Sequence, residues 1–473
     1  MKISFHGADQ NVTGSCHLIE CAGKRILIDC GMYQGGRELE EENAEPFGFD
    51  PASIDFLLLT HAHLDHCGRI PLLVKRGFKG EIITTPATVE LARLVMLDSA
   101  GLQEEEARYK QRKANRRSGN HNSNNGTNHS QKIIEPLYTT VDALNSLDYF
   151  GRKANYDTNL QLAQGIHATF IDAGHILGSA SILLELEETD KKHRILFSGD
   201  LGYSNRAILR NPATPPKVDS VVMETTYGDR LHKQLEPSID ELYDIINDTI
   251  GRGGNIIIPT FALERAQEIL YYLREGVNNK TLKHYLNVYL DSPMAISATQ
   301  IFERHPECYN RETLQAAVNG KDPFKLPGLR FTRETSESIA ISQLDGGAVI
   351  MAGSGMCTGG RIRHHLKHNL WGRKNSIIFV GYAARGTLAR KIIDGAERVR
   401  IFSEEIQVNA SIHTIGGFSA HADQAELLAW HKKTGTPTTT FLVHGEEKSM
   451  NTFSKKIKNS NVIMPEFGDE FEL

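Results

Sequence analysis

Short apolar runs alternate with polar, glycine-containing turns through the first 200 residues. Residues 26–28 run into Asp29, residues 56–59 run into a histidine cluster, and residues 195–197 run into Asp200. Apolar runs of this length that end in turn residues predict buried β-strands. Because a rigid sheet holds the loops at its strand ends in place, the polar residues there are candidates for a functional site.

From residue 218 the pattern changes to strands and helices in alternation. The predicted helices are 236–251 and 264–275, and the predicted strands are 218–224, 255–259, 288–291, 348–352 and 376–380. This order is typical of a parallel sheet covered by helices. A last apolar run, 439–443, leads into His444 in the manner of the first 200 residues.

One long helix is expected within the first 200 residues. Residues 86–107 carry apolar side chains along one side at helical spacing. Residues 112–131, which follow, are rich in Asn, Ser, His and basic residues and can bury little apolar area. We expect a flexible surface loop over that second range.

Length and composition indicate a soluble multidomain protein. The 473 residues exceed one ordinary hydrophobic core and predict two or three domains. No apolar run reaches the ~18 residues of a membrane span, and the first residues lack the apolar segment of a signal peptide. The six cysteines form no C-x-x-C pair, which is typical of reduced thiols. We therefore expect a cytoplasmic location and no membrane contact.

Charge is distributed unevenly along the chain. The net charge of −5 argues against non-specific binding of polyanions over the whole surface. Residues 359–400 nevertheless hold ten Lys and Arg against two Asp and Glu. An acidic protein with one basic stretch can bind nucleic acid at that stretch.

The segment His61-Ala-His63-Leu-Asp65-His66 carries the strongest chemical signal. In an extended backbone, residues two apart point to one side, so His61 and His63 can share a metal ion. A turn after them can aim Asp65 and His66 toward a second ion. Imidazole nitrogens and carboxylate oxygens are the ligands that zinc prefers. A lone histidine is more often packed or solvated, but three with an aspartate in six residues favour a metal site.

This segment resembles the H-x-H-x-D-H signature of the metallo-β-lactamase superfamily. Further residues match the family in order: Asp29 at a strand end, His175 in the segment Asp-Ala-Gly-His-Ile-Leu-Gly-Ser, and Asp200 in Ser-Gly-Asp-Leu-Gly. Each of these matches alone is weak evidence for a metal site, since a Gly-Asp pair at a strand end is usually a turn. The resemblance implies an α/β fold, the αββα sandwich of that superfamily.

About 200 residues of α/β sequence follow Asp200, and this insertion resembles the β-CASP subfamily of nucleases. Three markers support the resemblance: Glu224 at a strand end, His421 in Phe-Ser-Ala-His-Ala-Asp, and His444 in Leu-Val-His-Gly-Glu. The match is with the compact bacterial type of ribonuclease. It implies an inserted β-CASP domain over residues 213–404, flanked by the two parts of the sandwich domain, 1–212 and 405–473.

The resemblance also implies a role for each matched residue. His61, His63 and His175 hold one Zn²⁺, whereas Asp65, His66 and His444 hold the other. Asp200 bridges the two ions and Asp29 orients the site. His421 is the general acid, and Glu224 positions it. On this interpretation Asp29, Asp65, Glu224 and His421 form the catalytic group.

A glycine-rich turn between a strand and a basic helix is a candidate for binding backbone phosphates. In residues 351–361, Ser354, Gly355 and Arg361 are the expected contacts, because glycines allow close approach and a helix N-terminus favours an anion. Arg385 and Thr387, in a second such turn, are weaker candidates. The alternative is a tight turn followed by a solvated basic helix face.

These patterns favour a zinc-dependent ribonuclease that cleaves single-stranded RNA by a two-metal mechanism. A histidine at the position of His444 is typical of RNA-processing members of the resembled family. One alternative is a hydrolase of small thioesters or phosphoesters with the same fold, and another is an inactive RNA-binding scaffold. The sequence also leaves a homodimer open.

Overall fold

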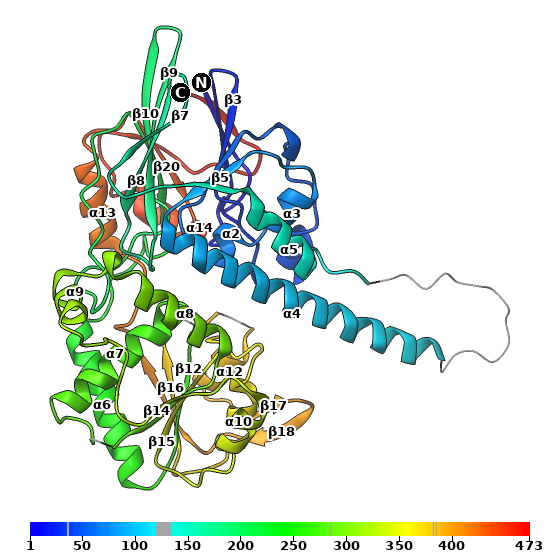
Figure 1. The fold of residues 1–473 in the computed structure, drawn as a ribbon, viewed down its shortest axis with the longest axis vertical. Helices are drawn as coiled ribbons and strands as arrows, with labels where there is room; N and C mark the ends of the chain where they lie inside the picture. The colour runs from blue at the N-terminus through cyan, green and yellow to red at the C-terminus, as the bar shows by residue number, and fades with distance from the viewer. Residues whose placement is uncertain (36, 120–133, 284, 382, 385) are drawn as a thin grey trace.

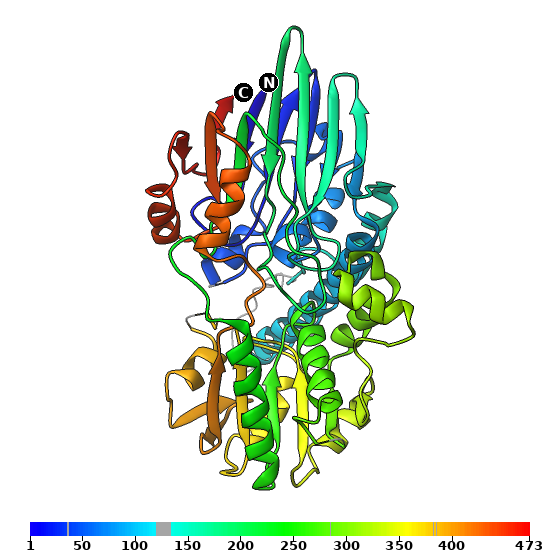
Figure 2. The same ribbon diagram turned by 90° about the vertical axis from the view of Figure 1, so that its left-hand side faces the viewer.

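The computed structural model describes the whole chain except residues 36, 120–133, 284, 382 and 385. Two β-sheets make up the upper half of the molecule in Figure 1, and a third sheet makes up the lower half. Figure 2 shows the two chain termini side by side at the upper end. Among the described residues, no helix combines the length and the apolar character that crossing a bilayer requires.

The first sheet has the strand order β22-β1-β2-β3-β4-β5-β6 over the described residues. Its strands are β1 (Lys2–Phe5), β2 (His17–Cys21), β3 (Lys24–Ile28), β4 (Phe56–Leu58), β5 (Glu81–Thr84), β6 (Phe150–Lys153) and β22 (Glu470–Glu472). The antiparallel pair β1 and β22 joins the two ends of the chain, with Lys2 opposite Glu472.

The second sheet has the order β21-β20-β11-β10-β9-β8-β7 over the described residues. Its strands are β7 (Asn159–Ala163), β8 (Ile166–Asp172), β9 (Ala180–Glu188), β10 (Lys191–Phe197), β11 (Ser220–Glu224), β20 (Thr439–Val443) and β21 (Asn461–Ile463). β20 inserts beside β11 in parallel, so the C-terminal region completes a sheet that the first half of the chain begins.

Alternating side chains explain why the two sheets pack as the middle layers of a sandwich. In β3, Ile26 and Ile28 belong to a buried cluster that also holds Phe197 of the second sheet. Leu27, on the opposite face, packs in a cluster with Leu91 of a covering helix. This two-residue period buries both faces of the strand. The αββα sandwich expected from the resemblance is confirmed.

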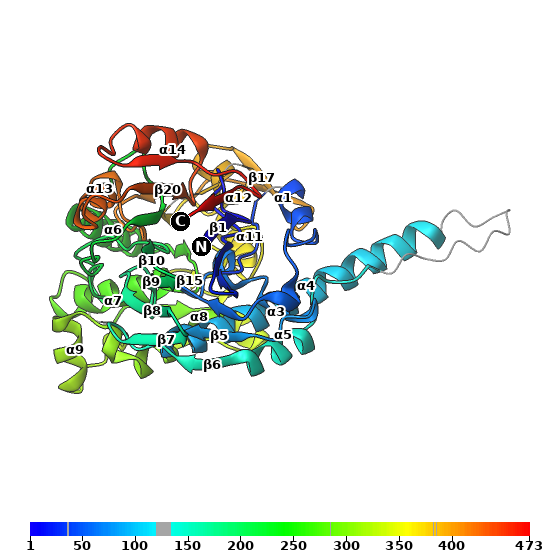
Figure 3. The same ribbon diagram turned by 90° about the horizontal axis from the view of Figure 1, so that it is seen from above.

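Four described helices cover the first sheet and two cover the second, as clusters of buried residues show. They are α2 (Leu64–Cys67), α3 (Ile70–Lys75), α4 (Pro86–Gly119) and α5 (Thr140–Ser146), then α13 (Gln424–Lys433) and α14 (Glu447–Ser454). The short α1 (Arg37–Glu42) lies beside the first sheet in Figure 3.

The inserted domain is built on a parallel sheet with the order β14-β13-β15-β12-β16-β19 over the described residues. Its strands are β12 (Ile256–Pro259), β13 (Asn287–Leu290), β14 (Leu329–Phe331), β15 (Ala348–Ala352), β16 (Ser376–Val380) and β19 (Ser411–Ile415), and a separate hairpin pairs β17 (Arg398–Ile401) with β18 (Glu404–Gln407). Its helices are α6 (Leu235–Gly251), α7 (Arg265–Asn278), α8 (Pro293–Arg304), α9 (Arg311–Val318), α10 (Thr335–Ile341), α11 (Ile362–Asn369) and α12 (Leu388–Ile393).

Strand pairing assigns two strands differently from the residue ranges that we expected. β11 lies within the predicted insertion, 213–404, but pairs with β10 and β20 of the sandwich. β19 lies within the predicted return segment, 405–473, but pairs with β16 of the inserted sheet. An apolar run predicts that a strand forms, whereas the sheet that it joins depends on long-range packing. The boundaries at 212 and 404 stay predictions.

The prediction of a loop from residue 112 is wrong for its first eight residues. α4 continues without a break to Gly119. Lys, Arg, Gln and Ala have high helix propensity, so this polar segment can stay helical without burying apolar area. The rest of the expected loop, residues 120–131, lies outside the described residues.

Candidate metal centre

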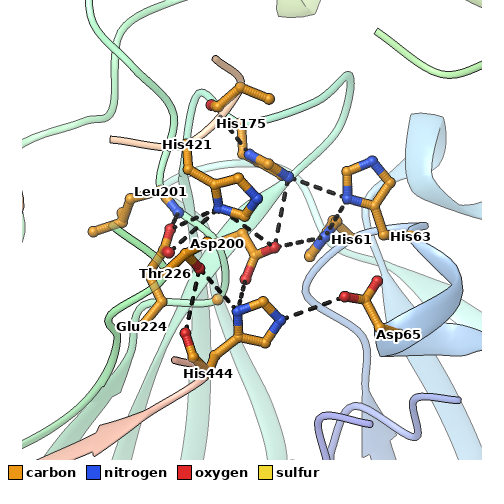
Figure 4. A network of polar contacts seen from close by, with 12 residues as sticks. His61, His63, Asp65, His175, Asp200, Leu201, Glu224, Thr226, His421 and His444 are labelled. Carbon is orange, nitrogen blue, oxygen red and sulfur yellow. Dashed lines mark hydrogen bonds and ion pairs between the residues drawn. The ribbon is translucent and has the colours of Figure 1, made fainter. Parts of the chain in front are cut away.

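Side chains from four separate segments converge at the edge of the sandwich where several strands end (Figure 4). β4 leads into His61 and His63, and α2 carries Asp65 and His66. His175 follows β8, Asp200 follows β10, and His444 follows β20. The sequence predicted all seven of these residues, and the structure brings them together around Asp200.

The first group of donor atoms surrounds one oxygen of Asp200. His63 Nδ1 lies 3.1 Å from His61 Nε2 and 3.1 Å from His175 Nε2. Asp200 Oδ2 lies 3.5 Å from His61 Nε2 and 3.6 Å from His175 Nε2. Four donors held at zinc–ligand distances of about 2.1 Å form a tetrahedron with edges of about 3.4 Å. The spacing of these four atoms therefore fits one zinc ion.

The second group surrounds the other oxygen of Asp200. His66 Nε2 lies 3.3 Å from Asp200 Oδ1 and 3.3 Å from His444 Nε2. Asp65 Oδ2 lies 3.4 Å from His444 Nε2. Asp200 Oδ1 is buried and has no hydrogen-bond partner among the described residues. A buried carboxylate oxygen without a partner is costly, and a cation shared with Asp65, His66 and His444 would remove that cost.

Hydrogen bonds to the outer ring nitrogens aim four of the five imidazoles inward. His66 Nδ1 faces Asp29 Oδ2 at 2.7 Å, and His61 Nδ1 faces the Thr60 hydroxyl at 3.0 Å. The other two Nδ1 atoms face the Thr226 hydroxyl, 3.1 Å from His444, and the Ala420 carbonyl, 3.3 Å from His175. A proton on Nδ1 leaves the lone pair of Nε2 free for a metal. These hydrogen bonds at Nδ1 therefore orient the histidines of both donor groups.

Asp29 connects the two donor groups through hydrogen bonds. Its carboxylate accepts hydrogen bonds from the Thr60 backbone N–H and the Thr60 hydroxyl, each at 2.8 Å. The same hydroxyl contacts His61, so Asp29 supports His66 directly and His61 through Thr60. Asp29 and His444 both adopt positive φ angles, 61° and 48°. Non-glycine residues in this region store strain of about 1–3 kcal/mol, which is typical of functional sites.

Burial and neighbouring charges divide the histidines of the site into two kinds. Burial lowers the pKa of His63 to about 4, and it lowers the pKa values of His61 and His175 as well. Burial alone would also lower the pKa of His66, but the carboxylates of Asp200 and Asp29 outweigh it and raise that pKa. The first group is thus neutral near pH 7, the state in which imidazole binds a metal.

Glu224 and His421 lie beside the two donor groups, as the sequence predicted. His421 Nδ1 is 3.3 Å from Glu224 Oε1 and 3.9 Å from Asp200 Oδ2. Glu224 is buried at the end of β11, and its Oε1 also accepts a 2.6 Å hydrogen bond from the Leu201 backbone N–H. Burial lowers the pKa of His421, but Glu224 and then Asp200 outweigh burial and raise the pKa to about 9. The His421 side chain is 20% exposed, so a substrate can reach it.

Sequence reasoning missed a buried ion network that joins the site to the inserted domain. Arg206 Nη1 donates to the carbonyl of His175 at 3.0 Å. The same guanidinium pairs with Glu264 at 3.0 Å and with Glu268 at 3.1 Å, both at the start of α7. Arg265 adds a second ion pair to Glu268. Arg206 lies 62 residues before Glu268, so no local pattern marks it as a partner of the charged residues at the start of α7.

The predicted phosphate contacts lie around the carboxyl ends of the inserted sheet. Ser354 and Gly355 follow β15, and a side chain at Gly355 would meet the Phe261 ring at 2.8 Å. Thr387 caps α12 by accepting the Arg390 backbone N–H at 3.2 Å. Arg385 lies outside the described residues. Their contact with substrate stays a prediction.

Arg361 has an extensive set of partners within its own domain. Its guanidinium donates to the buried carboxylate of Asp291 at 2.7 Å and to the carbonyl oxygens of Thr332 and Arg333 at 3.0 and 2.6 Å. His365 Nε2 contacts the other Asp291 oxygen at 2.6 Å. Arg361 therefore stabilises the turn that carries Ser354, and a direct phosphate contact by Arg361 stays a prediction.

Three protein families match successive parts of the chain. The metallo-beta-lactamase superfamily matches residues 10–243, the Beta-Casp domain matches 266–392, and the Zn-dependent metallo-hydrolase RNA specificity domain matches 405–465. Together with the sandwich and its donor groups, these matches define a metal-dependent hydrolase.

Relatives match over almost the full length of the chain. Ribonuclease TTHA0252 of Thermus thermophilus is 38% identical over 99% of both chains. An RNase J-like protein of Methanocaldococcus jannaschii is 30% identical over 96% of this chain and 95% of its own. The transcription termination factor FttA of the same organism is 30% identical over 97% of this chain and 69% of its own. The chain therefore belongs to the metallo-β-lactamase superfamily, in the group that carries a β-CASP domain.

A solved structure supports the fold alone. A protein of unknown function from Enterococcus faecalis aligns over 100% of this chain and 99% of its own, with a TM-score of 0.55 and 12% identity. At this identity the likeness says nothing about chemistry.

Proposed function

We propose that this chain is a zinc-dependent ribonuclease that hydrolyses phosphodiester bonds of single-stranded RNA with two bound metal ions in the cytoplasm. The observation that carries the proposal is the convergence of six donor residues on Asp200 with the His421–Glu224 pair beside them. The names of two relatives, ribonuclease TTHA0252 and an RNase J-like protein, support RNA as the substrate. The match to an RNA specificity domain over residues 405–465 agrees with it.

The donor set favours zinc over harder cations. Five imidazoles and two carboxylates suit zinc, whereas magnesium and calcium prefer oxygen ligands. His61, His63 and His175 would hold one ion, Asp65, His66 and His444 would hold the other, and Asp200 would contact both. Bound there, the ions would lower the pKa of a water molecule toward neutrality and offset negative charge on the phosphate.

The side chains of the protein supply proton transfer and orientation. Hydrolysis adds a water oxygen to phosphorus and breaks the bond to one sugar oxygen, which must leave with a proton. His421 donates that proton, because Glu224 and Asp200 keep its imidazole protonated near neutral pH. Glu224 fixes the His421 ring through Nδ1, so Nε2 is the atom that carries the proton to the substrate.

The test is cleavage of end-labelled single-stranded RNA, and of the DNA of the same sequence, by the zinc-loaded protein and by His421→Ala. A matched control is His167→Ala, which removes a half-buried histidine of β8 away from the donor groups. We expect His421→Ala to retain two zinc ions by elemental analysis and to cleave RNA roughly 10²-fold or more slowly. The control should cleave at the wild-type rate.

Other outcomes separate the alternatives. A wild-type protein that holds two zinc ions but cleaves neither polymer would overturn the proposal and direct the search to small esters and thioesters. A protein that binds RNA but holds no zinc would be a scaffold. Cleavage of DNA at the rate of RNA would remove the preference for RNA.

A further inference from the structure

The helix α4 begins beside the metal centre and ends far from it. The hydroxyls of Thr85 and Thr88 donate to the carbonyl of Gly178 at 2.7 and 2.9 Å, and Gly178 shares a loop with His175. In Figure 1 the helix runs along the boundary between the sandwich and the inserted domain, and Figure 3 shows it projecting beyond both. Ala107 is its last buried residue among those whose side chains are described.

The first projecting residues of α4, 108–113, are strongly basic. They contain four Lys and Arg and no Asp or Glu, in a chain whose net charge is −5. The side chains of Arg108, Lys110, Arg112 and Lys113 are exposed. Tyr109 is 64% exposed among them. Cations spaced along a rod with an exposed aromatic ring suit a single-stranded nucleic acid, whose phosphates need cations and whose bases stack on aromatic side chains.

The charge pattern disfavours the helix unless an anion is present. At the start of this segment, Lys110 forms an ion pair of 2.7 Å with Glu106 at i,i+4 spacing, which supports the helix. The next i,i+4 neighbours, Arg108 and Arg112, carry like charges. Such pairs destabilise a helix, and a polyanion laid along them removes the repulsion.

Helix geometry gives the distance from this segment to the donor groups. Thr88 and Arg112 are 24 residues apart, which at 1.5 Å per residue is roughly 36 Å. A stacked strand carries one phosphate about every 3.4 Å. About ten nucleotides therefore separate an RNA phosphate at the metal centre from one at Arg112.

We propose that residues 108–113 form a basic arm that binds the phosphates of a long RNA substrate about ten nucleotides from the bond that is cleaved. This inference rests on the proposed ribonuclease function and adds a substrate-length requirement to it. RNA shorter than about ten nucleotides cannot reach the arm, whereas longer RNA gains affinity from it. The cation sites of the arm lie outside the metal centre, so the arm changes KM and leaves kcat unchanged.

The test compares a 6-nucleotide and a 30-nucleotide RNA with the zinc-loaded enzyme and the variant Arg112→Gln/Lys113→Gln. Glutamine keeps high helix propensity, so the helix should persist, which circular dichroism checks. The control is Lys191→Gln/Lys192→Gln, which removes the same charge from the exposed first residues of β10. We expect KM for the long RNA to rise roughly tenfold at 0.1 M salt in the arm variant, and the short RNA to be unaffected.

Salt dependence gives a second readout that needs no cleavage. Each single-strand phosphate contact contributes about 0.7 to the slope of log K against log salt. Binding of the long RNA by fluorescence anisotropy should thus lose about 1.4 from its slope in the arm variant and nothing in the control. An unchanged slope and KM would overturn the arm proposal and leave the ribonuclease function standing. Binding without any cleavage would refute the ribonuclease function, while the slope still decides whether the arm contacts RNA.

Discussion

Replacing Asp29 with asparagine tests whether the residues behind the ligands control the metal centre. The Asp29 carboxylate accepts three hydrogen bonds, two from Thr60 and one from His66 Nδ1. Oδ2 accepts both the Thr60 hydroxyl and the His66 N–H. Asparagine keeps the shape but presents an NH₂ group to at least one of these donors. At least one bond is lost, and the charge that holds the proton on His66 Nδ1 disappears.

The expected loss falls on one metal site. Removing a carboxylate that orients a ligating histidine costs about 10- to 100-fold in metal affinity, roughly 1.4–2.7 kcal/mol. His66 belongs to the group with Asp65 and His444, so that site should weaken. His61 contacts the Thr60 hydroxyl rather than Asp29 itself, so the site with His63 and His175 should change by less than threefold.

The assay is a competitive zinc titration of the metal-free protein against a chromogenic chelator, which resolves two affinities. The variant Thr60→Val provides the opposite perturbation, because it removes the hydroxyl that supports His61 and leaves Asp29 bonded to His66. His66→Ala identifies which affinity belongs to the second group. We expect Asp29→Asn and Thr60→Val to weaken different sites. If Asp29→Asn left both affinities unchanged, or weakened only the site that His66→Ala leaves intact, the assigned contacts would be wrong.

Two further predictions concern the whole chain. Removing zinc with a chelator should abolish cleavage. It should also lower the free energy of unfolding by about 2.7 kcal/mol per site, if the free zinc concentration before removal was 100 times the dissociation constant. Adding zinc back should restore both, and recovery with magnesium alone would argue against the histidine-rich site. Arg206→Met should destabilise the protein by about 3–5 kcal/mol in urea unfolding, because it leaves Glu264 and Glu268 buried with only Arg265 as a partner. The double variant Arg206→Met/Glu268→Met should recover part of that loss, and no recovery would indicate a packing effect.

Local spacing predicted the donors of residues 61–66, because His61 and His63 are two residues apart directly after an apolar strand. His175, Asp200 and His444 each follow a strand as well, but it was the family resemblance that singled them out. The strands and most helices of the inserted domain also follow from local periodicity. The sheet that β11 joins does not, because its partners β10 and β20 lie on opposite sides of the inserted domain in sequence.

The contacts between distant residues could not be predicted from spacing. Asp291 binds Arg361 and His365, 70 and 74 residues later, and nothing in the sequence marks the three as neighbours. The helical arm had a detectable signal, since residues 108–113 combine high helix propensity with like charges. The expectation of a loop from residue 112 rested on the few apolar side chains that residues 112–131 can bury.

The order in which the ligands occur along the chain has a consequence for synthesis of the protein. His66 and His444 face each other at 3.3 Å although 378 residues separate them. A growing chain can therefore assemble the site of His61, His63 and His175 once its first half has folded, yet the second site waits for β20 to insert beside β11. Until residue 444 has left the ribosome, the nascent chain therefore holds only the first of the two donor groups, and the second group forms when β20 pairs with β11.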